Sequence, residues 1–240
     1  MAVLLVREDR EFVMAPGEEK GTDLGVIEVP EDVAPGDTVE THLGEAFRVR
    51  ALRGPDLFHH LERTGAPMLP RDVGLIVGET GVRSGDRVLD AGTGTGVLAS
   101  TLGRIGADVT TYEQDSEFAE VARENMSLAE VADSVDVRTG DVTDQLDDLG
   151  PFDVLTLDTA DAPAVVERAP ELLVSGGSLA VYSPFVEDAR EVVETAHEAD
   201  LENVRCEETI QREMDFGDRG SRPSTKGVGH TGYLVFARAR

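Results

Sequence analysis

The sequence predicts a doubly wound α/β domain preceded by a small β-domain, and three observations support this fold class. From about Pro70 onward, apolar strands alternate with amphipathic helices, which is the order that builds a parallel sheet covered by helices on both faces. A glycine-rich turn links the first of these strands to its helix. Before that point, short alternating stretches are separated by proline and glycine. We therefore assign a small β-domain to residues 1–62 and an α/β domain to residues 63–240.

The first domain is expected to be a sheet or barrel of short strands. Breaks between the strands are predicted at Pro16-Gly17, Pro30 and Pro35-Gly36. No catalytic cluster is recognisable in this part of the sequence. The predicted strands cover residues 3–6, 11–15, 25–29, 38–41 and 46–52.

The second domain is expected to alternate strands with helices. Strands are predicted over 87–90, 108–113, 134–138, 152–158 and 178–183, and two more, over 204–212 and 231–237, close the sheet. Helices are predicted over 97–104, 116–131 and 186–199, and another is expected to begin after Ala162 and to end at Gly176-Gly177. Residues 215–229 are rich in Gly, Ser, Arg and Pro, so a loop is predicted there.

The charge balance is unusual, because 48 acidic residues face 22 basic ones. Of the basic residues only Lys20 and Lys226 are lysines. An acidic surface for basic partners is one interpretation, and adaptation to multimolar salt is the other. The even spread of acidic residues, the use of arginine and the few aromatics favour the second interpretation and indicate a halophilic organism. Salt near 1 M shortens the screening length to roughly 3 Å, so the self-repulsion of such a chain costs little there.

Several classes of protein are disfavoured by composition. No apolar run reaches the roughly 20 residues of a membrane span, and the N-terminus lacks the order of a signal peptide. The single cysteine, Cys206, excludes an intrachain disulfide or a cysteine-cluster metal site. His59 and His60 are adjacent and would point in different directions on a helix, which disfavours a shared metal ion. We therefore expect a cytoplasmic protein with no membrane segment and no metal.

The glycine-rich turn has features that point to its ligand. Glycines allow the tight turn and let a ligand approach backbone amides at the end of the sheet. The Gly-x-Gly-x-Gly spacing differs from the Gly-x-Gly-x-x-Gly of dinucleotide folds, and an acidic residue stands two positions before the first glycine. A carboxylate suits a cofactor that carries an amino group and a sulfonium cation, which indicates S-adenosylmethionine. The residues predicted to bind it here are Asp90, Gly92, Thr93, Gly94, Gly96 and Val97.

Acidic residues also follow the next three strands. Glu113 lies 21 residues after Gly92, where a carboxylate can bond both hydroxyls of a cofactor ribose, and Gln114 stands beside it. Asp141 is predicted to accept from the adenine amine of the cofactor while Val142 packs against the ring. Asp158 ends the fourth strand at the switch point of the sheet, where substrates bind. Taken singly, Glu113 could be a solvated strand end and Asp158 a helix cap, but their order along the chain favours a cofactor site.

Beyond this general pattern, the sequence resembles the tRNA (adenine-N1)-methyltransferases that modify the T-loop of tRNA. The resemblance covers nearly the whole chain and implies a Rossmann-like class I methyltransferase fold with a small N-terminal β-domain. It also implies S-adenosylmethionine as methyl donor, adenine 58 of tRNA, with or without adenine 57, as the target, and a homotetramer. The segments that carry it are Arg53-Gly-Pro-Asp56-Leu, His60-Leu-Glu-Arg63-Thr64, Leu69-Pro70-Arg71-Asp72, the glycine-rich turn, Arg222-Pro223-Ser-Thr, and Val228-Gly-His230-Thr231-Gly232-Tyr-Leu-Val.

The resemblance assigns the chemistry to Asp158, which matches an aspartate at the end of the fourth strand in the family. A base methylated at N1 must first leave its stack. The product is cationic, so a carboxylate near N1 and N6 would stabilise the developing charge, and Asp158 is expected to be both catalytic and in contact with the cofactor. The residues expected to contact the substrate are Arg63, Arg71, Tyr182, Arg222 and His230. Contacts with tRNA phosphates are expected from segment 50–63 and from segment 215–229, which contains Arg219, Arg222 and Lys226.

The chain also departs from the family pattern in three places, one of which is Gly65-Ala-Pro-Met68, where the family has a polar stretch. The family follows its aspartate with Pro, an acidic residue and a second Pro, whereas this chain has Thr159-Ala160-Asp161-Ala162-Pro163. The family commonly places Tyr before the Pro-Lys-Asp step, whereas Leu69 precedes Pro70-Arg71 here. An aromatic that could stack on the substrate base is therefore missing, and Tyr182 or Phe185 is the candidate replacement.

Three other functions compete with this interpretation. A class I methyltransferase acting on isoaspartyl carboxyl groups or on a small molecule shares the glycine-rich turn but lacks the N-terminal β-domain and the His-Thr-Gly segment. A dinucleotide oxidoreductase is disfavoured by the loop spacing, because Asp90 would face a pyrophosphate. A non-catalytic tRNA-binding protein would have no need of an intact glycine-rich turn with Glu113.

Overall fold

The computed structural model describes residues 2–227 and 229–240, which form two compact units. The first unit holds Met1–Leu61 with Leu128–Glu130, and the second holds Glu62–Ser127 with Val131–Arg240. Val228, which belongs to the predicted 215–229 loop and to the C-terminal sequence segment, lies outside the described residues, as does Met1.

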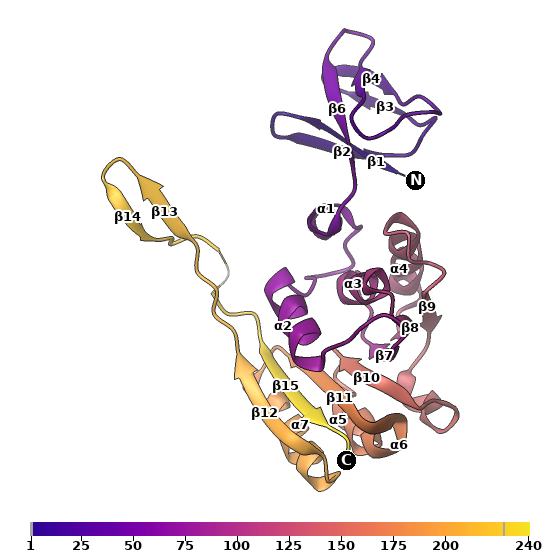
Figure 1. The fold of residues 1–240 in the computed structure, drawn as a ribbon, viewed down its shortest axis with the longest axis vertical. Helices are drawn as coiled ribbons and strands as arrows, with labels where there is room; N and C mark the ends of the chain where they lie inside the picture. Colours follow the sequence, from indigo (N-terminus) through magenta and orange to yellow (C-terminus); the bar gives the residue numbers. More distant parts are fainter. Residues whose placement is uncertain (1, 228) are drawn as a thin grey trace. The chain divides into compact units, whose positions relative to one another are not determined.

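The first unit is built on a four-stranded antiparallel sheet in the order β2-β1-β6-β5 (Figure 1). Its strands are β1 (Val3–Arg7), β2 (Arg10–Met14), β5 (Thr38–Glu40) and β6 (Ala46–Ala51), and β3 (Glu19–Thr22) and β4 (Gly25–Glu28) form a separate hairpin. Alternate residues of these strands, among them Leu5, Ile27 and Phe47, form a fully buried core. The hairpin strand β3 was not predicted, because its residues are nearly all exposed and have no apolar alternation.

A helix that was not predicted, α1 (Gly54–His60), ends this unit. Pro55 occupies its first turn, where a missing N–H costs nothing. The Asp56 carboxylate accepts a hydrogen bond from the Arg53 backbone N–H at 2.8 Å, as in a capping box. The sequence segment Arg53-Gly-Pro-Asp56 therefore contains the residues that favour the start of this helix.

The second unit contains a seven-stranded sheet in the order β12-β15-β11-β10-β7-β8-β9. Five strands are parallel: β7 (Arg87–Ala91), β8 (Asp108–Glu113), β9 (Val135–Thr139), β10 (Phe152–Leu157) and β11 (Leu173–Ser183). The last two, β12 (Glu202–Glu208) and β15 (Tyr233–Arg238), were expected to continue a parallel sheet, but β15 runs antiparallel to both of its neighbours. No helix connects β12 to β15 in the described part of that connection, and a parallel pair needs such a crossover.

Helices cover both faces of this sheet (Figure 1). On one face lie α2 (Pro70–Thr80) and α3 (Val97–Ile105), followed in the chain by α4 (Ser116–Leu128). On the other face, α6 (Ala169–Leu172) packs on β11, α7 (Val186–Glu198) packs on β11, β12 and β15, and α5 (Ala162–Glu167) packs against α6 and α7. A short 3-10 helix, η1 (Val142–Asp148), follows β9. Buried residues such as Leu155, Val165 and Val192 join the sheet to α5 and α7 in one core.

Two predicted elements were wrong in kind. Gly176-Gly177 does not end a helix, since it lies inside β11, where the register of pairing with β10 shifts between Phe152 and Val154. The predicted loop over 215–229 contains a hairpin of β13 (Met214–Gly217) and β14 (Gly220–Pro223). A strand was not predicted there because the segment is rich in glycine and serine, although Met214 and Phe216, both exposed, alternate with polar residues. In addition, α4 ends at Leu128 and β12 at Glu208, earlier than expected.

Candidate active site

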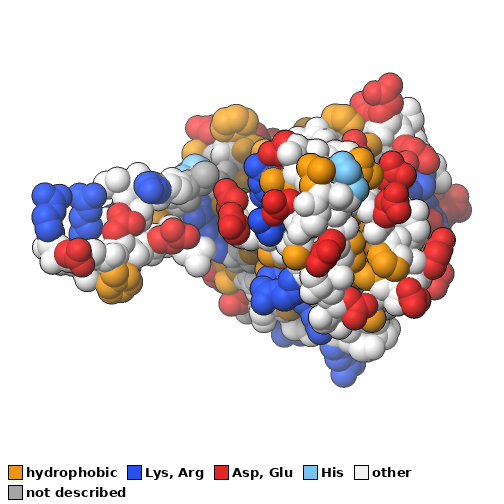
Figure 2. All heavy atoms as spheres, turned by 90° about the horizontal axis from the view of Figure 1, so that it is seen from above, with side chains coloured by type: hydrophobic (Ala, Val, Ile, Leu, Met, Phe, Trp, Pro, Cys, Tyr) orange, Lys and Arg blue, Asp and Glu red, His pale blue; other side chains and the backbone are white. Residues whose placement is uncertain are grey.

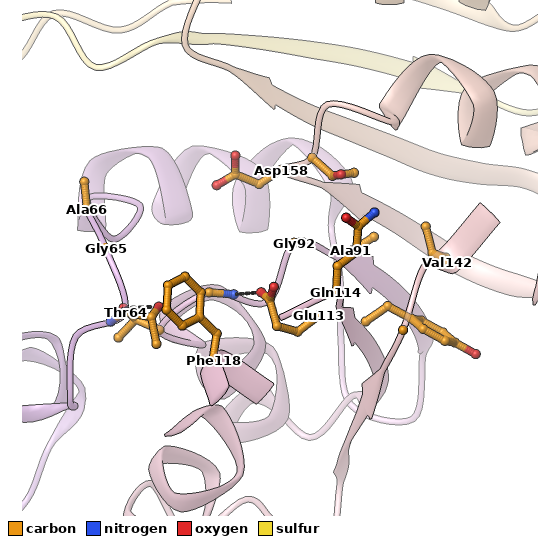
Figure 3. A pocket seen from close by; sticks show the side chains of 15 residues that line it. Thr64, Gly65, Ala66, Ala91, Gly92, Glu113, Gln114, Phe118, Val142 and Asp158 are labelled. Atoms are coloured by element: carbon orange, nitrogen blue, oxygen red, sulfur yellow. Dashed lines mark hydrogen bonds between the residues drawn. The ribbon is translucent and has the colours of Figure 1, made fainter. Parts of the chain in front are cut away.

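The carboxyl ends of the parallel strands meet around a cavity of about 300 Å³ (Figure 3). The glycine-rich turn after β7, the end of β8, the turn after β9 and the end of β10 each contribute to its wall, as expected for ligands of open α/β sheets. The lining residues are Thr64, Gly65, Ala66, Ala91, Gly92, Gly94, Thr95, Tyr112, Glu113, Gln114, Phe118, Gly140, Val142, Asp158 and Thr159.

Gly92 is the point at which the glycine-rich turn rests on β10. Its φ angle is +88°, a conformation that favours glycine, and an added Cβ would lie 2.0 Å from the Asp158 carbonyl oxygen. The Asp158 N–H in turn donates to the Ala91 carbonyl oxygen at 2.8 Å. Any side chain at residue 92 would therefore displace Asp158.

Glu113 and Gln114 face the cavity from the end of β8. One Glu113 carboxylate oxygen accepts from the Gly94 backbone N–H at 2.8 Å, the contact drawn as a dashed line in Figure 3. The other accepts from the Asp115 N–H at 3.1 Å. Gln114 Nε2 donates to an Asp161 carboxylate oxygen at 2.9 Å. Glu113 thus holds the glycine-rich turn in place while its carboxylate faces the cavity.

Asp90 lies near the end of β7, just before the glycine-rich turn, and is buried. The Thr111 and Thr156 hydroxyls each donate to one of its carboxylate oxygens at 2.6 Å. Burial raises the pKa of Asp90, although these two hydrogen bonds act in the opposite direction. Together with Thr93, Gly96 and Val97, this residue lines an adjoining space of about 50 Å³, which shares Gly92, Gly94 and Asp158 with the first cavity. These four predicted cofactor residues therefore do not line the first cavity itself.

The turn after β9 contributes Gly140 and Val142 to the cavity, whereas Asp141 is not among the lining residues. One Asp141 carboxylate oxygen accepts from the Thr143 N–H at 2.8 Å and from the Thr143 hydroxyl at 2.7 Å, so it caps η1. Phe118 and Tyr112, which were not predicted, also line the cavity. Phe118 is 39% exposed on α4, and an exposed aromatic just after the Glu113 strand end is a signal that the sequence contained.

Asp158 lies where two cavities meet. A second cavity, of about 350 Å³, shares only Asp158 and Thr159 with the first. The remainder of its wall comes from the turn after β10 and from the β11–α7 connection: Ala160, Ala162, Pro163, Tyr182, Ser183, Pro184, Phe185, Asp188, Glu191 and Val192. Asp158 as a whole residue is exposed, because solvent reaches it through the cavities, while protein encloses much of the surroundings of its carboxyl group.

The environment of Asp158 makes it an unusual acid. Desolvation, followed by the nearby Asp90 carboxylate, raises its pKa to about 7. Its protonation state therefore changes near neutrality, and a cation placed beside it would favour the carboxylate. A group with these properties between two cavities is a candidate catalytic residue.

The predicted substrate contacts are dispersed. Tyr182 lines the second cavity, but Arg63, Arg71, Arg222 and His230 line neither of the two. Arg222 lies on β14 with its side chain 72% exposed, and His230 Nδ1 contacts a Glu208 carboxylate oxygen at 2.6 Å. Arg63 is exposed beside the cavity residue Thr64.

Arg71 is the clearest departure from prediction. Its side chain is only 6% exposed, and its guanidinium donates to the Thr231 hydroxyl at 3.0 Å. A guanidinium enclosed in this way is directed at the protein and not at a phosphate in solvent. The family resemblance had indicated Arg71 as a substrate contact, whereas arginine in a folded protein is seldom so deeply buried.

Among the described residues, no group of three or more His, Cys, Asp or Glu side chains is arranged to hold a metal ion. Within the same part of the chain, no helix combines the length and apolar character required to cross a bilayer.

Comparison with known proteins identifies the family. The profile described as tRNA methyltransferase complex GCD14 subunit matches residues 59–219. A tRNA (adenine(57)-N(1)/adenine(58)-N(1))-methyltransferase of Methanocaldococcus jannaschii is 33% identical over 98% of this chain and 94% of its own length. The chain belongs to this methyltransferase family. A tRNA (adenine(58)-N(1))-methyltransferase of Thermus thermophilus is 28% identical, covering 86% of this chain and 82% of that one.

Solved structures agree on the fold of this methyltransferase. A SAM-dependent O-methyltransferase from Thermotoga maritima superposes with a TM-score of 0.84 at 26% identity, over 99% of this chain and 92% of that one. The tRNA (m1A58) methyltransferase of Aquifex aeolicus gives 0.77 at 22% identity, over 99% and 96% of the two chains. The protein is therefore a class I enzyme with a Rossmann-like sheet, and its methyl donor is S-adenosylmethionine.

Proposed function

We propose that the protein transfers a methyl group from S-adenosylmethionine to N1 of adenine in the T-loop of tRNA, at position 58 alone or together with 57. The observation that carries this proposal is the 33% identity, over nearly the full length of both chains, to a relative described as acting on adenines 57 and 58. The shared length includes the N-terminal β-unit as well as the catalytic one.

The first cavity, of about 300 Å³ at the strand ends, suits the methyl donor. Gly92 and Gly94 present backbone in place of side chains on one wall, and Glu113 places a carboxylate at the end of β8. Phe118 and Val142 supply apolar surface for an aromatic ring. When bound, S-adenosylmethionine supplies a methyl group on a sulfonium sulfur. We assign Glu113 and the backbone of the glycine-rich turn to holding the ribose and the amino acid part of the donor.

The second cavity is the proposed seat of the target adenine. It adjoins the donor cavity only through Asp158 and Thr159, and most of its remaining wall is apolar. Phe185 is 64% exposed beside it, and an exposed aromatic at a cavity wall can stack on a base that has left its helix. This arrangement would place the base edge next to Asp158.

Asp158 has a defined task in such a complex. The N1 lone pair forms the new N–C bond as the S–C bond breaks, so no proton has to be removed from the base. Positive charge passes to the adenine ring, and the Asp158 carboxylate beside it would stabilise that charge as it develops. The rest of the rate enhancement would come from holding N1 in line with the methyl group.

The setting of the enzyme follows from the same proposal. We place it in the cytoplasm with tRNA and, on the family resemblance, as a homotetramer, and we keep residues 1–62 and 63–240 as its β-domain and catalytic domain. Figure 2 shows acidic side chains spread over the visible face and not gathered in one patch, which supports a halophilic origin for the net charge of −26. Activity that peaks in dilute buffer and is lost in molar KCl would contradict that origin.

Basic side chains are available for tRNA despite the net charge. Arg219 and Arg222 lie on the exposed β13–β14 hairpin, and Lys226 follows it. We propose that they contact phosphates, together with segment 50–63. Because counterion release weakens as salt rises, shape and base contacts would supply most of the affinity in concentrated salt. Neutralising Arg219 and Arg222 should raise the Kd for tRNA without changing the Kd for S-adenosylmethionine, and an equal loss of both would refute the assignment.

The function is tested by mass spectrometry of nucleosides. An unmodified tRNA transcript is incubated with the protein and S-adenosylmethionine, then digested. We expect 1-methyladenosine, its loss when adenines 57 and 58 are both replaced, and its near absence with Asp158→Ala. The Thermotoga neighbour is described as an O-methyltransferase, so isoaspartyl peptides serve as the competing substrate. Methyl ester formation on the peptide, with an unmethylated transcript, would overturn the proposal.

A further inference from the structure

Two sequence segments that the proposed site leaves unexplained meet in the structure. The Leu69-Pro70-Arg71-Asp72 segment begins α2, and the His230-Thr231-Gly232 segment leads into β15. Thr231 and Asp72 lie 159 residues apart in the chain, yet the Thr231 hydroxyl donates to an Asp72 carboxylate oxygen at 2.9 Å. The same hydroxyl oxygen accepts from Arg71 Nη2 at 3.0 Å. Thr231 therefore bridges an acid and a base on α2.

The bridged pair, Arg71 and Asp72, is buried, so both charged groups need hydrogen-bond partners within the protein. The Arg71 and Asp72 side chains are 6% and 4% exposed, and the Arg71 Nε to Asp72 Oδ2 distance is 3.8 Å. Buried charges require well-placed hydrogen-bond partners, because removing one partner leaves the other desolvated. The Thr231 hydroxyl contributes such a partner to both charges at once.

The backbone of the same residue holds Tyr182. The Tyr182 hydroxyl donates to the Thr231 carbonyl oxygen at 2.6 Å. The next residue, Gly232, lies so close that an added Cβ would be 2.6 Å from Tyr182 Cζ and 2.7 Å from its hydroxyl oxygen. Burial and the carboxylates of Asp158 and Asp72 raise the pKa of Tyr182, so it stays a neutral donor. Tyr182 lines the second cavity together with Asp158.

We infer that Thr231 is a positioning residue: anchored by Arg71 and Asp72, it fixes the Tyr182 ring as a wall of the cavity that receives the target base. The inference rests on the proposed function for the identity of the base. The C-terminal segment therefore shapes the substrate site without lining it. Arg71, predicted from sequence as a substrate contact, acts here through Thr231.

Kinetics with matched variants test the role. Thr231→Val removes the bridging hydroxyl, Thr231→Ser keeps it, and Tyr182→Phe removes the bond to the Thr231 carbonyl while keeping the ring. We expect Thr231→Val and Tyr182→Phe each to lower kcat/KM for tRNA by about three- to thirty-fold, with the Kd for S-adenosylmethionine within about twofold of the parent. Thr231→Ser should stay within about twofold in both. The double variant Thr231→Val with Tyr182→Phe should lose less than the product of the two single losses, because the two residues share one contact.

A second readout does not depend on activity. The chain has three tyrosines and no tryptophan, so protein labelled with 3-fluorotyrosine gives three ¹⁹F resonances, assignable from Tyr→Phe variants. Thr231→Val should shift or broaden the Tyr182 resonance and leave that of Tyr112, in the donor cavity, unchanged, while Thr231→Ser leaves both unchanged. A lower Tm with an unmoved Tyr182 resonance and unchanged tRNA kinetics would overturn the inference. If the parent protein makes no 1-methyladenosine, the proposed function fails, and the ¹⁹F result still decides whether Thr231 positions Tyr182.

Discussion

The two cavities that meet at Asp158 are built from the chain in different ways. The donor cavity is formed by successive strand ends, with Gly92 and Gly94 after β7, Glu113 after β8 and Val142 after β9. The second cavity is formed by the turn after β10 and by Tyr182 to Val192, and Tyr182 is held from residues 72 and 231. The first follows from the order of a doubly wound sheet, whereas the second depends on contacts between distant segments. We infer that donor binding is the more general property of this fold and that substrate choice resides in the second cavity.

The largest effect is expected for Gly92→Ala, which would break the donor cavity. Its Cβ would collide with the Asp158 carbonyl oxygen at 2.0 Å in a positive-φ conformation, so we expect a loss of about 2–5 kcal/mol in the free energy of unfolding and no measurable binding of S-adenosylmethionine. Gly85→Ala is the control, since Gly85 has nearly the same φ angle of +87°, an added Cβ there meets no atom within 4 Å, and the residue does not line the donor cavity. Thermal melting and calorimetric titration measure the two quantities, and equal donor affinity in both variants would contradict the account.

Asp158→Asn should separate chemistry from donor binding. We expect the single-turnover rate at saturating donor to fall about 10²- to 10³-fold, as when one group that stabilises transition-state charge is removed. The Kd for S-adenosylmethionine should change by only a few-fold. Rapid-quench measurement of methyl transfer to tRNA gives the rate, with Asp144→Asn on the exposed side of η1 as the control. A single-turnover rate in Asp158→Asn equal to that of the parent would show that Asp158 does not stabilise the transition state.

Glu113→Gln should weaken the donor cavity alone. The carboxylate holds the Gly94 N–H and faces the cavity, and a charge-assisted hydrogen bond contributes about 1.5–3 kcal/mol. We therefore expect the Kd for S-adenosylmethionine to rise roughly ten- to a hundred-fold, measured by calorimetry. Glu117→Gln, on the first turn of α4, should bind the donor as the parent does, and a parent-like Kd in Glu113→Gln would exclude the ribose contact.

The smallest of these effects is the pH dependence. Because the pKa of Asp158 is raised to about 7, the folded protein binds more protons than the unfolded chain between about pH 4 and 7. The contribution of this residue to stability therefore falls as pH rises through that window. Activity moves in the opposite direction, since the carboxylate is the active form, and kcat/KM should rise with pH to a plateau above about 7. Asp158→Asn should abolish this rise in its residual activity, and an unchanged profile in that variant would assign it to another group.

The same contrast between the cavities explains what could be predicted from sequence. The glycine-rich turn and Glu113 were recognisable because their roles depend on local backbone geometry and on strand order. The family resemblance indicated Arg71 and His230 as substrate contacts, and an arginine in sequence gives no sign that Thr231 and Asp72 will enclose it. The β13–β14 hairpin was missed, since its two strands pair only with each other and have no buried face to impose a pattern.

The most direct test of the two-cavity account is a paired measurement on Glu113→Gln and Phe185→Ala. Both the Kd for S-adenosylmethionine and the single-turnover rate of tRNA methylation at saturating donor and limiting tRNA are measured for each. We predict that Glu113→Gln raises the Kd with a rate close to that of the parent. Phe185→Ala should lower the rate about five- to a hundredfold, as expected for the loss of one base–aromatic stack of about 1–3 kcal/mol, with an unchanged Kd. If Phe185→Ala weakened the donor as much as Glu113→Gln does and left methylation intact, the assignment of one cavity to the donor and the other to adenine would be wrong.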